Sequence, residues 1–308
     1  MYQKLDNIAQ LENLRSRFEI KARLLSALRD FFSSDGFLEV STPVRIDAPA
    51  PEEYIEAVTS GSSFLRTSPE LEMKRLLAAG YEKIYQIGPC FRAEEYGRMH
   101  RPEFLMLEWY QAGADYNALL EFTRKMLTFA ALKLSGEPKC RFKNQIIDFS
   151  GEWKIFTVNE AFCHFAGVSV FDALNNGQFE ELLVEKVEPS LPRDIPVVLK
   201  DYPAEQASLA RLKNGDSTVA ERWELYLGGV EIANAFSELV DPAEQKTRFK
   251  ESSEFRRKHG MADYPEPVKF IEALDYGMPE SSGCALGIDR LAMIMADGKC
   301  LADVVFPK

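Results

Sequence analysis

The spacing of apolar side chains divides the chain into helices and strands. Residues 17–33 carry apolar side chains at helical spacing and end at Asp35-Gly36, so we expect an amphipathic helix there, followed by a strand at 37–44. Residues 1–16 are polar, and we expect them to form an N-terminal arm. The helical period predicts further helices near residues 70–77, 117–134, 157–165, 179–187, 241–260, 266–276 and 289–295.

Residues 85–110 are the most informative stretch, with two apolar strands joined by a charged loop. The loop carries Arg92, Arg98 and Arg101, and Gly97 lies at its tip. Planar guanidinium groups suit phosphate oxygens, and charged groups near the start of buried strands need partners. The pattern therefore predicts a polyphosphate clamp, and a solvated surface hairpin is the alternative.

A second hairpin, at residues 221–239, is acidic. Gly228-Gly229 is typical of a two-residue turn, which would make Glu224 face Ala233 and place Glu224 and Glu231 on one face. Two carboxylates so placed can hold a divalent cation, although exposed strand acids are the alternative. A bulge near residues 233–235 would be needed to bring three further positions into the same pocket. These positions are Asn234, Phe236 and Glu238.

Near the C-terminus, a glycine-containing strand breaks directly into a helix. The sequence CALGI at 284–288 precedes the predicted helix at 289–295. Gly283 and Gly287 would let the backbone approach a flat ligand closely, and Arg290, one turn into the helix, could reach the same ligand.

The segment Ser68-Pro69-Glu70 is typical of a helix start, with Ser at the N-cap and Pro at the first helical position. Glu70 has two interpretations. It is either a first-turn carboxylate that the helix dipole favours, or a polar group aimed at the amine of a ligand.

Composition excludes several classes of protein. The chain has 308 residues and a formal net charge of −11, which argues against non-specific nucleic-acid binding. Its five cysteines contain no CxxC pair and its three histidines are far apart, so we expect no disulfide frame and no structural zinc. An apolar leader and a membrane-spanning run are both missing from the sequence. We therefore expect a cytoplasmic protein that is not attached to a membrane.

Taken together, these segments resemble the three signature motifs of class II aminoacyl-tRNA synthetases, in chain order. Residues 18–44 resemble motif 1, which forms the dimer interface in that family. FRAEEYGRMHRPEFLMLEWY resembles motif 2, and GCALGIDRLAMIMAD resembles motif 3. Within the class, SPELEMKRLL, HRPEFLMLEWY, GVEIANAFSEL and ALGIDRL are most similar to the lysine branch.

Only about 16 residues precede motif 1, so we expect a catalytic core without an anticodon-binding domain. A stand-alone lysine-type core is the hallmark of the elongation factor P–(R)-β-lysine ligase family. Trp109, Ala285 and the sequence PAEQASLA at 203–210 also resemble that family. The resemblance implies an α+β catalytic domain at 17–308, with a mainly antiparallel sheet flanked by helices. Residues 113–190, which carry no catalytic constellation, would form a helical insertion.

The resemblance also implies the activity: an ATP- and Mg²⁺-dependent homodimer would activate lysine or β-lysine and acylate elongation factor P rather than tRNA. Arg92 and Arg290 would be the catalytic residues, and Phe104 would stack under the adenine. Glu238 and Tyr110 would take the side-chain ammonium group. The implied ATP site comprises Arg92, Glu94, His100, Arg101, Phe104, Glu231, Ile232, Gly287 and Arg290. Glu224 and Glu231 would hold magnesium, and the implied amino-acid pocket comprises Ser68, Glu70, Glu108, Tyr110, Asn234, Phe236, Glu238 and Ala285.

The sequence departs from the family pattern at several positions. Ala93 replaces the usual Asn of motif 2, and Arg101 stands where Asn is common. Ala235 replaces a glycine, and Ser237 matches the tRNA enzymes rather than the ligases. These changes leave open the choice between α- and β-lysine. Two alternative functions also stay open: a lysyl-tRNA synthetase-like enzyme that acylates tRNA, and a non-catalytic paralogue.

Overall fold

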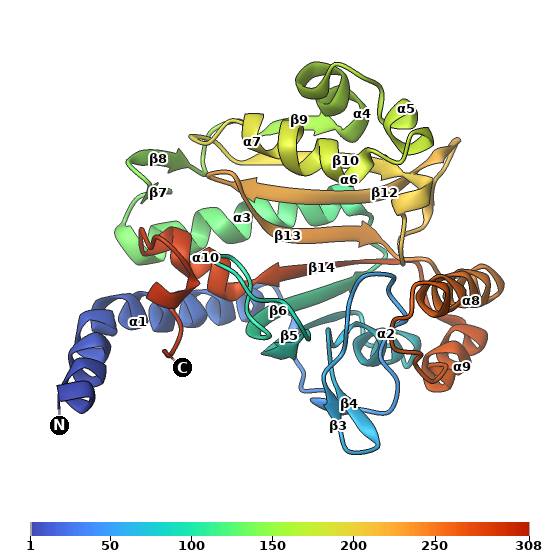
Figure 1. Cartoon of the computed structure of the whole chain (residues 1–308), viewed down its shortest axis with the longest axis horizontal. Coiled ribbons are helices and arrows are strands. Elements are labelled where there is room, and N and C mark those ends of the chain that lie inside the picture. The colour runs from blue at the N-terminus through green and yellow to red at the C-terminus, as the bar shows by residue number, and fades with distance from the viewer. Residues whose placement is uncertain (1, 308) are drawn as a thin grey trace.

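A nine-stranded sheet forms the centre of the computed structural model (Figure 1). The structure describes residues 2–307, with side chains described from residue 8. Neighbouring strands run antiparallel except where β1 pairs with β5 and β9 with β10, which confirms the predicted α+β class. In spatial order the strands are β1 (Leu38–Glu39), β5 (Lys83–Phe91), β6 (Glu103–Ala112), β14 (Ser281–Gly287), β13 (Val230–Ser237), β12 (Asp216–Leu227), β10 (Val197–Pro203) and β9 (Lys154–Thr157), and β11 (Leu212–Lys213) pairs with β12.

Within residues 2–307, two smaller sheets and ten α-helices surround this sheet. The small sheets comprise β2 (Arg45–Ile46), β3 (Thr59–Ser60) and β4 (Ser63–Leu65), and β7 (Lys139–Phe142) and β8 (Gln145–Asp148). The helices are α1 (Tyr2–Ser34), α2 (Glu70–Ala78), α3 (Tyr116–Ser135), α4 (Val158–Ala161), α5 (Val170–Asn175), α6 (Phe179–Leu182), α7 (Glu188–Ser190), α8 (Pro242–Lys258), α9 (Val268–Gly277) and α10 (Ile288–Met295). None of the helices in the described part of the chain is long and apolar enough to cross a bilayer.

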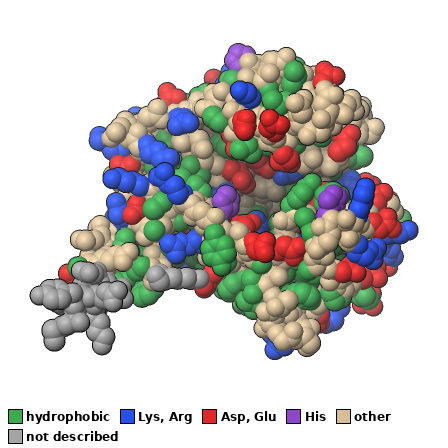
Figure 2. Space-filling model, in the orientation of Figure 1, with side chains coloured by type: hydrophobic (Ala, Val, Ile, Leu, Met, Phe, Trp, Pro, Cys, Tyr) green, Lys and Arg blue, Asp and Glu red, His purple; other side chains and the backbone are tan. Residues whose placement is uncertain are grey.

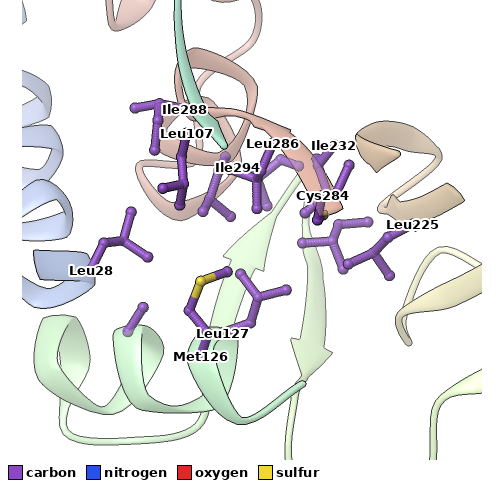
Figure 3. Close-up of a cluster of buried hydrophobic side chains, with 14 of the residues drawn as sticks. Leu28, Leu107, Met126, Leu127, Leu225, Ile232, Cys284, Leu286, Ile288 and Ile294 are labelled. Carbon is purple, nitrogen blue, oxygen red and sulfur yellow. The ribbon is translucent and has the colours of Figure 1, made fainter. Parts of the chain in front are cut away.

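Strand alternation separates the core from the cavity described below. On β6, Leu107 and Trp109 are buried in the main core, whereas Met106 lines the cavity. On β14, Leu286 points into the core and Ala285 into the cavity. Figure 3 shows side chains from α1, α3 and α10 meeting these core positions. Three helices therefore cover one face of the sheet, and the opposite face is left to build a site.

The N-terminal helix is longer than expected. The helix α1 begins at Tyr2, so residues 2–16, predicted to be a separate arm, continue the helix predicted at 17–33. No glycine or proline interrupts residues 2–34, which removes the usual reason for a break. The strand expected at 37–44 shortens to β1, which lies at the sheet edge.

The region predicted to be a helical insertion, at about 113–190, is divided between two parts of the fold. The helix α3 packs in the main core, and β9 joins the central sheet. The Asp115 side chain caps the start of α3 by accepting hydrogen bonds from the backbone N–H groups of Asn117 and Ala118. Gly136, with a φ of 82°, ends the helix. The segment at 158–191 packs into a separate, smaller core together with side chains of β10 and Tyr226 of β12, so the predicted range contributes to two cores.

Candidate active site

A cavity of about 290 Å³ opens on the sheet face opposite to the main core. Strands β6, β12, β13 and β14 form its floor, and the β5–β6 loop and α10 form part of its wall. Most of the residues predicted to bind ATP or metal line this cavity, together with two of those predicted to bind the amino acid. They are Arg92, His100, Arg101, Phe104, Glu224, Glu231, Ile232, Asn234, Ala285, Gly287 and Arg290.

Arg92 has the properties expected of a ligand-binding cation. Its guanidinium carbon lies 5.3 Å from the ring centroid of Phe104, and its Nη1 lies 3.5 Å from Glu95 Oε1. Its Nε is buried and has no partner among the described residues. A buried donor without a partner is costly, so a ligand acceptor at this position would be stabilised.

Arg290 ties the β5–β6 loop to β13. Its Nε donates to the Met99 carbonyl at 3.2 Å, its Nη1 donates to the Glu231 carbonyl at 2.9 Å, and its Nη2 lies 2.7 Å from His100 Nε2. Partial desolvation, and then the charge of Arg290, lower the pKa of His100, so a neutral imidazole can accept this bond. The guanidinium is therefore held in place at the cavity wall before any ligand binds.

The structure places Glu94, predicted to bind ATP, outside the lining of the cavity. This residue is exposed, adopts a φ of 63°, and does not line the cavity. The neighbouring Glu95 lines it instead. The left-handed backbone at Glu94 turns the loop, and alternation read from the sequence cannot anticipate such a turn.

A bulge in β13 assembles the acidic hairpin, but at a different position from the predicted one. Tyr226 pairs with Glu231 and Leu225 with Ala233, so the extra residue is Ile232 rather than one of residues 233–235. Glu224 consequently pairs with Asn234 and not with Ala233. The bulge brings Asn234 to the cavity beside Glu224 and Glu231, whereas Phe236 and Glu238, predicted for the same pocket, are not among the residues that line it.

Glu224 and Glu231 can supply carboxylate ligands to a divalent cation. Both lie on the cavity floor, and burial and then the charge of Glu224 raise the pKa of Glu231, so the two carboxylates repel each other. Among the described residues no group of three or more His, Cys, Asp or Glu side chains could hold a metal. Two carboxylates suit Mg²⁺, which completes its octahedron with water and substrate phosphate oxygens.

Glu224 already has three partners. Its Oε1 accepts from Arg222 Nη2 at 2.6 Å, and its Oε2 accepts from the hydroxyls of Tyr202 at 2.6 Å and Tyr226 at 2.8 Å. Arg222 also donates from Nε to Asn234 Oδ1 at 3.0 Å. A metal ion would therefore share or replace some of these contacts, and Arg222 is a site residue that the sequence analysis missed.

The remaining predicted residues form a buried acidic pocket beside the cavity. Glu108 accepts from Ser68 Oγ at 2.6 Å and from the Tyr110 hydroxyl at 3.0 Å. Burial, and then the charge of Glu70, raise the pKa of Glu108 to about 8. The two sites adjoin, since Ala285 on the cavity floor pairs with Glu108 on β6.

Lys74 occupies the centre of this pocket and was also missed. Its ammonium group is fully buried, lies 2.5 Å from Glu238 Oε2, and forms a second ion pair with Glu70. It also lies 5.3 Å from the ring centroid of Phe236. Burial opposes its charge, but Glu238 and Glu70 outweigh that effect and raise the pKa of Lys74, so it stays protonated.

Glu238 retains unused acceptor capacity despite Lys74. Burial raises its pKa to about 8, and Lys74 opposes this rise. Beyond the ion pair, its oxygens accept no hydrogen bond from any described residue. Three carboxyl groups, on Glu70, Glu108 and Glu238, therefore face one protein cation, so ionisation of Glu108 or Glu238 leaves the pocket suited to a second ammonium group.

Gly283 makes the close packing of this pocket possible. A Cβ built on Gly283 would lie 2.2 Å from a ring carbon of Tyr110 and 2.5 Å from Glu238 Oε1. Any larger residue would displace one of these side chains. The predicted close approach at Gly283 is thus made by two protein side chains that belong to the pocket.

Glu52 is a third residue that the sequence analysis missed. It lines the cavity with Arg92, and burial raises its pKa to about 7, whereas the charge of Arg92 lowers it. A carboxyl group with a pKa of about 7 therefore lines the cavity, and its pKa responds to both Arg92 and Glu70. Its position on the loop at 47–58, where prolines interrupt any periodic pattern, explains why it was not found.

Comparisons with known proteins identify the family to which the chain is similar. Residues 3–308 match the family of class II tRNA synthetases (D, K and N). The elongation factor P–(R)-β-lysine ligase of Proteus mirabilis is 37% identical over 93% of this chain and 93% of that protein. Lysine–tRNA ligases of Dehalococcoides mccartyi and Nitrosomonas europaea are 35% and 34% identical over 95% and 96% of this chain.

The chain spans 64% of the length of these two lysine–tRNA ligases. All three relatives are ligases by name, and the family match covers nearly every residue of the chain. The fold, the strand order and the paired acidic and arginine-containing sites lie within that matched region. The chain therefore belongs to the class II tRNA synthetases of the D, K and N group.

Proposed function

We propose that the protein activates a lysine-type amino acid with ATP and transfers the acyl group to a lysine side chain of elongation factor P. One observation carries the proposal: a buried acidic pocket, suited to an ammonium group, adjoins a cavity lined by Arg92 and Arg290. An amino acid with a side-chain amine can place its two charged ends in these two environments.

In the first step, a carboxylate oxygen of the amino acid attacks the α-phosphorus of ATP, the bond to the bridging oxygen breaks, and pyrophosphate leaves. Arg92 stabilises the charge that develops at the phosphorus, and Phe104 supports the adenine. Glu224 and Glu231 would hold magnesium, which neutralises phosphate charge. In the second step, the acceptor amine attacks the acyl carbon, AMP leaves, and the amine proton passes to solvent.

The choice of acceptor rests on the comparison with the ligase of Proteus mirabilis, because that similarity extends along nearly the whole of both proteins. Because the chain is also similar to lysine–tRNA ligases, tRNA is the alternative acceptor. We further propose a cytoplasmic homodimer. Five free cysteines support a reducing compartment, and the exposed Leu38 and Val44 support an interface in the motif 1 region.

ATP–pyrophosphate exchange with α-lysine and with (R)-β-lysine tests the first step. Transfer of each activated isomer to purified elongation factor P and to total tRNA, side by side, tests the second. We expect exchange with at least one isomer and acylation of the protein. Acylation of tRNA alone would overturn the proposed acceptor, and lack of exchange with both isomers would favour a non-catalytic paralogue.

A further inference from the structure

Three cationic side chains around the β5–β6 loop and the β12–β13 turn have no carboxylate partner among the described residues. Arg98 is in the β5–β6 loop, Lys143 is in the turn between β7 and β8, and Arg193 precedes β10. All three are exposed, and none forms an ion pair with a carboxylate in the part of the chain that the structure describes. Most other arginines near the cavity form ion pairs with carboxylates, whereas these three cations are available to bind a partner.

Lys143 and Arg193 meet at the β12–β13 turn. The Lys143 ammonium lies 4.8 Å from the ring centroid of Phe142, and that ring packs against Gly228. Arg193 lies against Gly229, with its Nε 3.3 Å from the position that a Cβ would take. Desolvation, and then the nearby charges of Arg193 and Arg98, lower the pKa of Lys143.

Arg98 connects this group to the cavity. Its carbonyl accepts the N–H of Leu301 at 3.1 Å, and Leu301 lines the cavity. The next residue, Met99, also lines the cavity and accepts from Arg290. The nearby carboxylate of Asp297 is engaged by the backbone N–H of Lys143 at 2.9 Å. A molecule that reaches into the cavity from this side would therefore pass over the three cations.

The surrounding charge favours an acidic protein as the occupant. The chain has a net charge of −11, and Figure 2 shows Lys and Arg side chains gathered on the side that carries β7 and β8, whereas Asp and Glu side chains border the central hollow. A nucleic acid presents phosphates along its whole length and would meet these acidic surfaces. A protein with a local acidic patch can match three cations and avoid the rest.

We propose that Arg98, Lys143 and Arg193 form a docking surface for an acidic patch of the acceptor protein, next to the lysine that receives the acyl group. This inference rests on the proposed function. Docking here would steer the acceptor lysine toward the cavity and hold it there, so the surface acts on the second step and leaves the first unchanged.

The test is a charge reversal, K143E/R193E, assayed in both steps with elongation factor P as acceptor. We expect the KM for elongation factor P to rise about tenfold, because each reversal removes an attraction and adds a repulsion. The exchange rate should stay at the wild-type value. Raising NaCl from about 50 to about 300 mM should increase the wild-type KM and affect the variant much less.

A matched control reverses two exposed lysines of α8, K250E/K258E, which lies at the opposite end of the molecule in Figure 1. An unchanged KM for elongation factor P in K143E/R193E, or an equal rise in the control, would overturn the docking surface. A loss confined to tRNA acylation would also overturn it and assign the surface to nucleic acid. If neither isomer supports exchange, the proposed function fails, and salt-dependent binding of elongation factor P to the two variants still tests the surface.

Discussion

Replacing Lys74 by methionine tests the electrostatics of the acidic pocket. Lys74 is fully buried, and it is the cation that faces Glu70 and Glu238. Methionine keeps much of the side-chain volume but removes the charge. A buried ion pair that loses one partner destabilises a protein by about 3–5 kcal/mol. The carboxyl groups can reduce this cost by binding protons, and each unit of pKa shift corresponds to about 1.4 kcal/mol.

The pKa values of two pocket carboxyl groups determine how stability and protonation of the pocket change with pH. Burial raises the pKa of Glu108 and of Glu238 to about 8 from the model-peptide value of 4.5, and Lys74 holds the pKa of Glu238 down. Between those values the native state binds more protons than the unfolded state, so the free energy of unfolding falls as the pH rises. Without Lys74, the pKa of Glu238 should rise further, and the pocket should be protonated at neutral pH.

The assay is ATP–pyrophosphate exchange, with the KM for lysine measured between about pH 6 and pH 9. In the wild type, KM should fall as the pH rises toward 8, because ionised carboxyl groups bind the ammonium group. In K74M, the KM for lysine at neutral pH should rise about tenfold for each unit by which the pKa of Glu238 increases. The decrease of this KM with rising pH should therefore occur at higher pH than in the wild type. Urea unfolding of K74M and E70Q/K74M provides the control, since the double variant removes one carboxylate with the cation and should recover stability. Coincident KM–pH profiles for K74M and the wild type would refute this account of the pocket.

Three further variants test the rest of the site. R92A should lower exchange by about 10²–10³-fold, because a preorganised charge at the developing oxyanion is lost, and a residual rate near wild type would remove Arg92 from the mechanism. E231Q should raise the Mg²⁺ concentration needed for half-maximal exchange while thermal stability changes little, and an unchanged Mg²⁺ dependence would show that the ion binds elsewhere. G283A should destabilise the protein by about 1–3 kcal/mol in urea unfolding and raise the KM for lysine, because its methyl group would meet two pocket side chains; a neutral effect would mean that the pocket can expand.

The sequence predicted the strands and turns of the site well, because one-sided burial of a sheet imposes a period of two. The Gly228-Gly229 turn, β6 and β14 lie where alternation placed them. The bulge at Ile232 was misplaced because alternation shows that an extra residue is needed but does not show which pair of residues it separates. Hydrogen bonding to the partner strands decides that position.

The site residues that were not predicted, such as Lys74 and Arg222, have weaker signals in the sequence. Lys74 follows Glu70 by four residues, a spacing that predicts an ion pair on a helix, but nothing in this spacing indicates that the pair is buried under β13 and β14. Arg222 precedes Glu224 by two residues, so both point to the same strand face. The pairing of each charge with a distant partner, such as Lys74 with Glu238, depends on tertiary packing and could not be read locally.

The distribution of charge over the two halves of the site fixes how a lysine-type substrate would lie. Its carboxylate is favoured near Arg92 and its side-chain ammonium near Glu238, whereas the reverse orientation would oppose like charges at both ends. Isomers of lysine share these two charged ends, so the ends set orientation and cannot select between isomers. Selection must come from groups between the ends, where Ala285 and Asn234 pair across β14 and β13 on the cavity floor. A methyl group at Ala285 and an amide that Arg222 already holds by its oxygen leave few positions for the second amino group, so we expect these two residues to set the isomer preference of the proposed reaction.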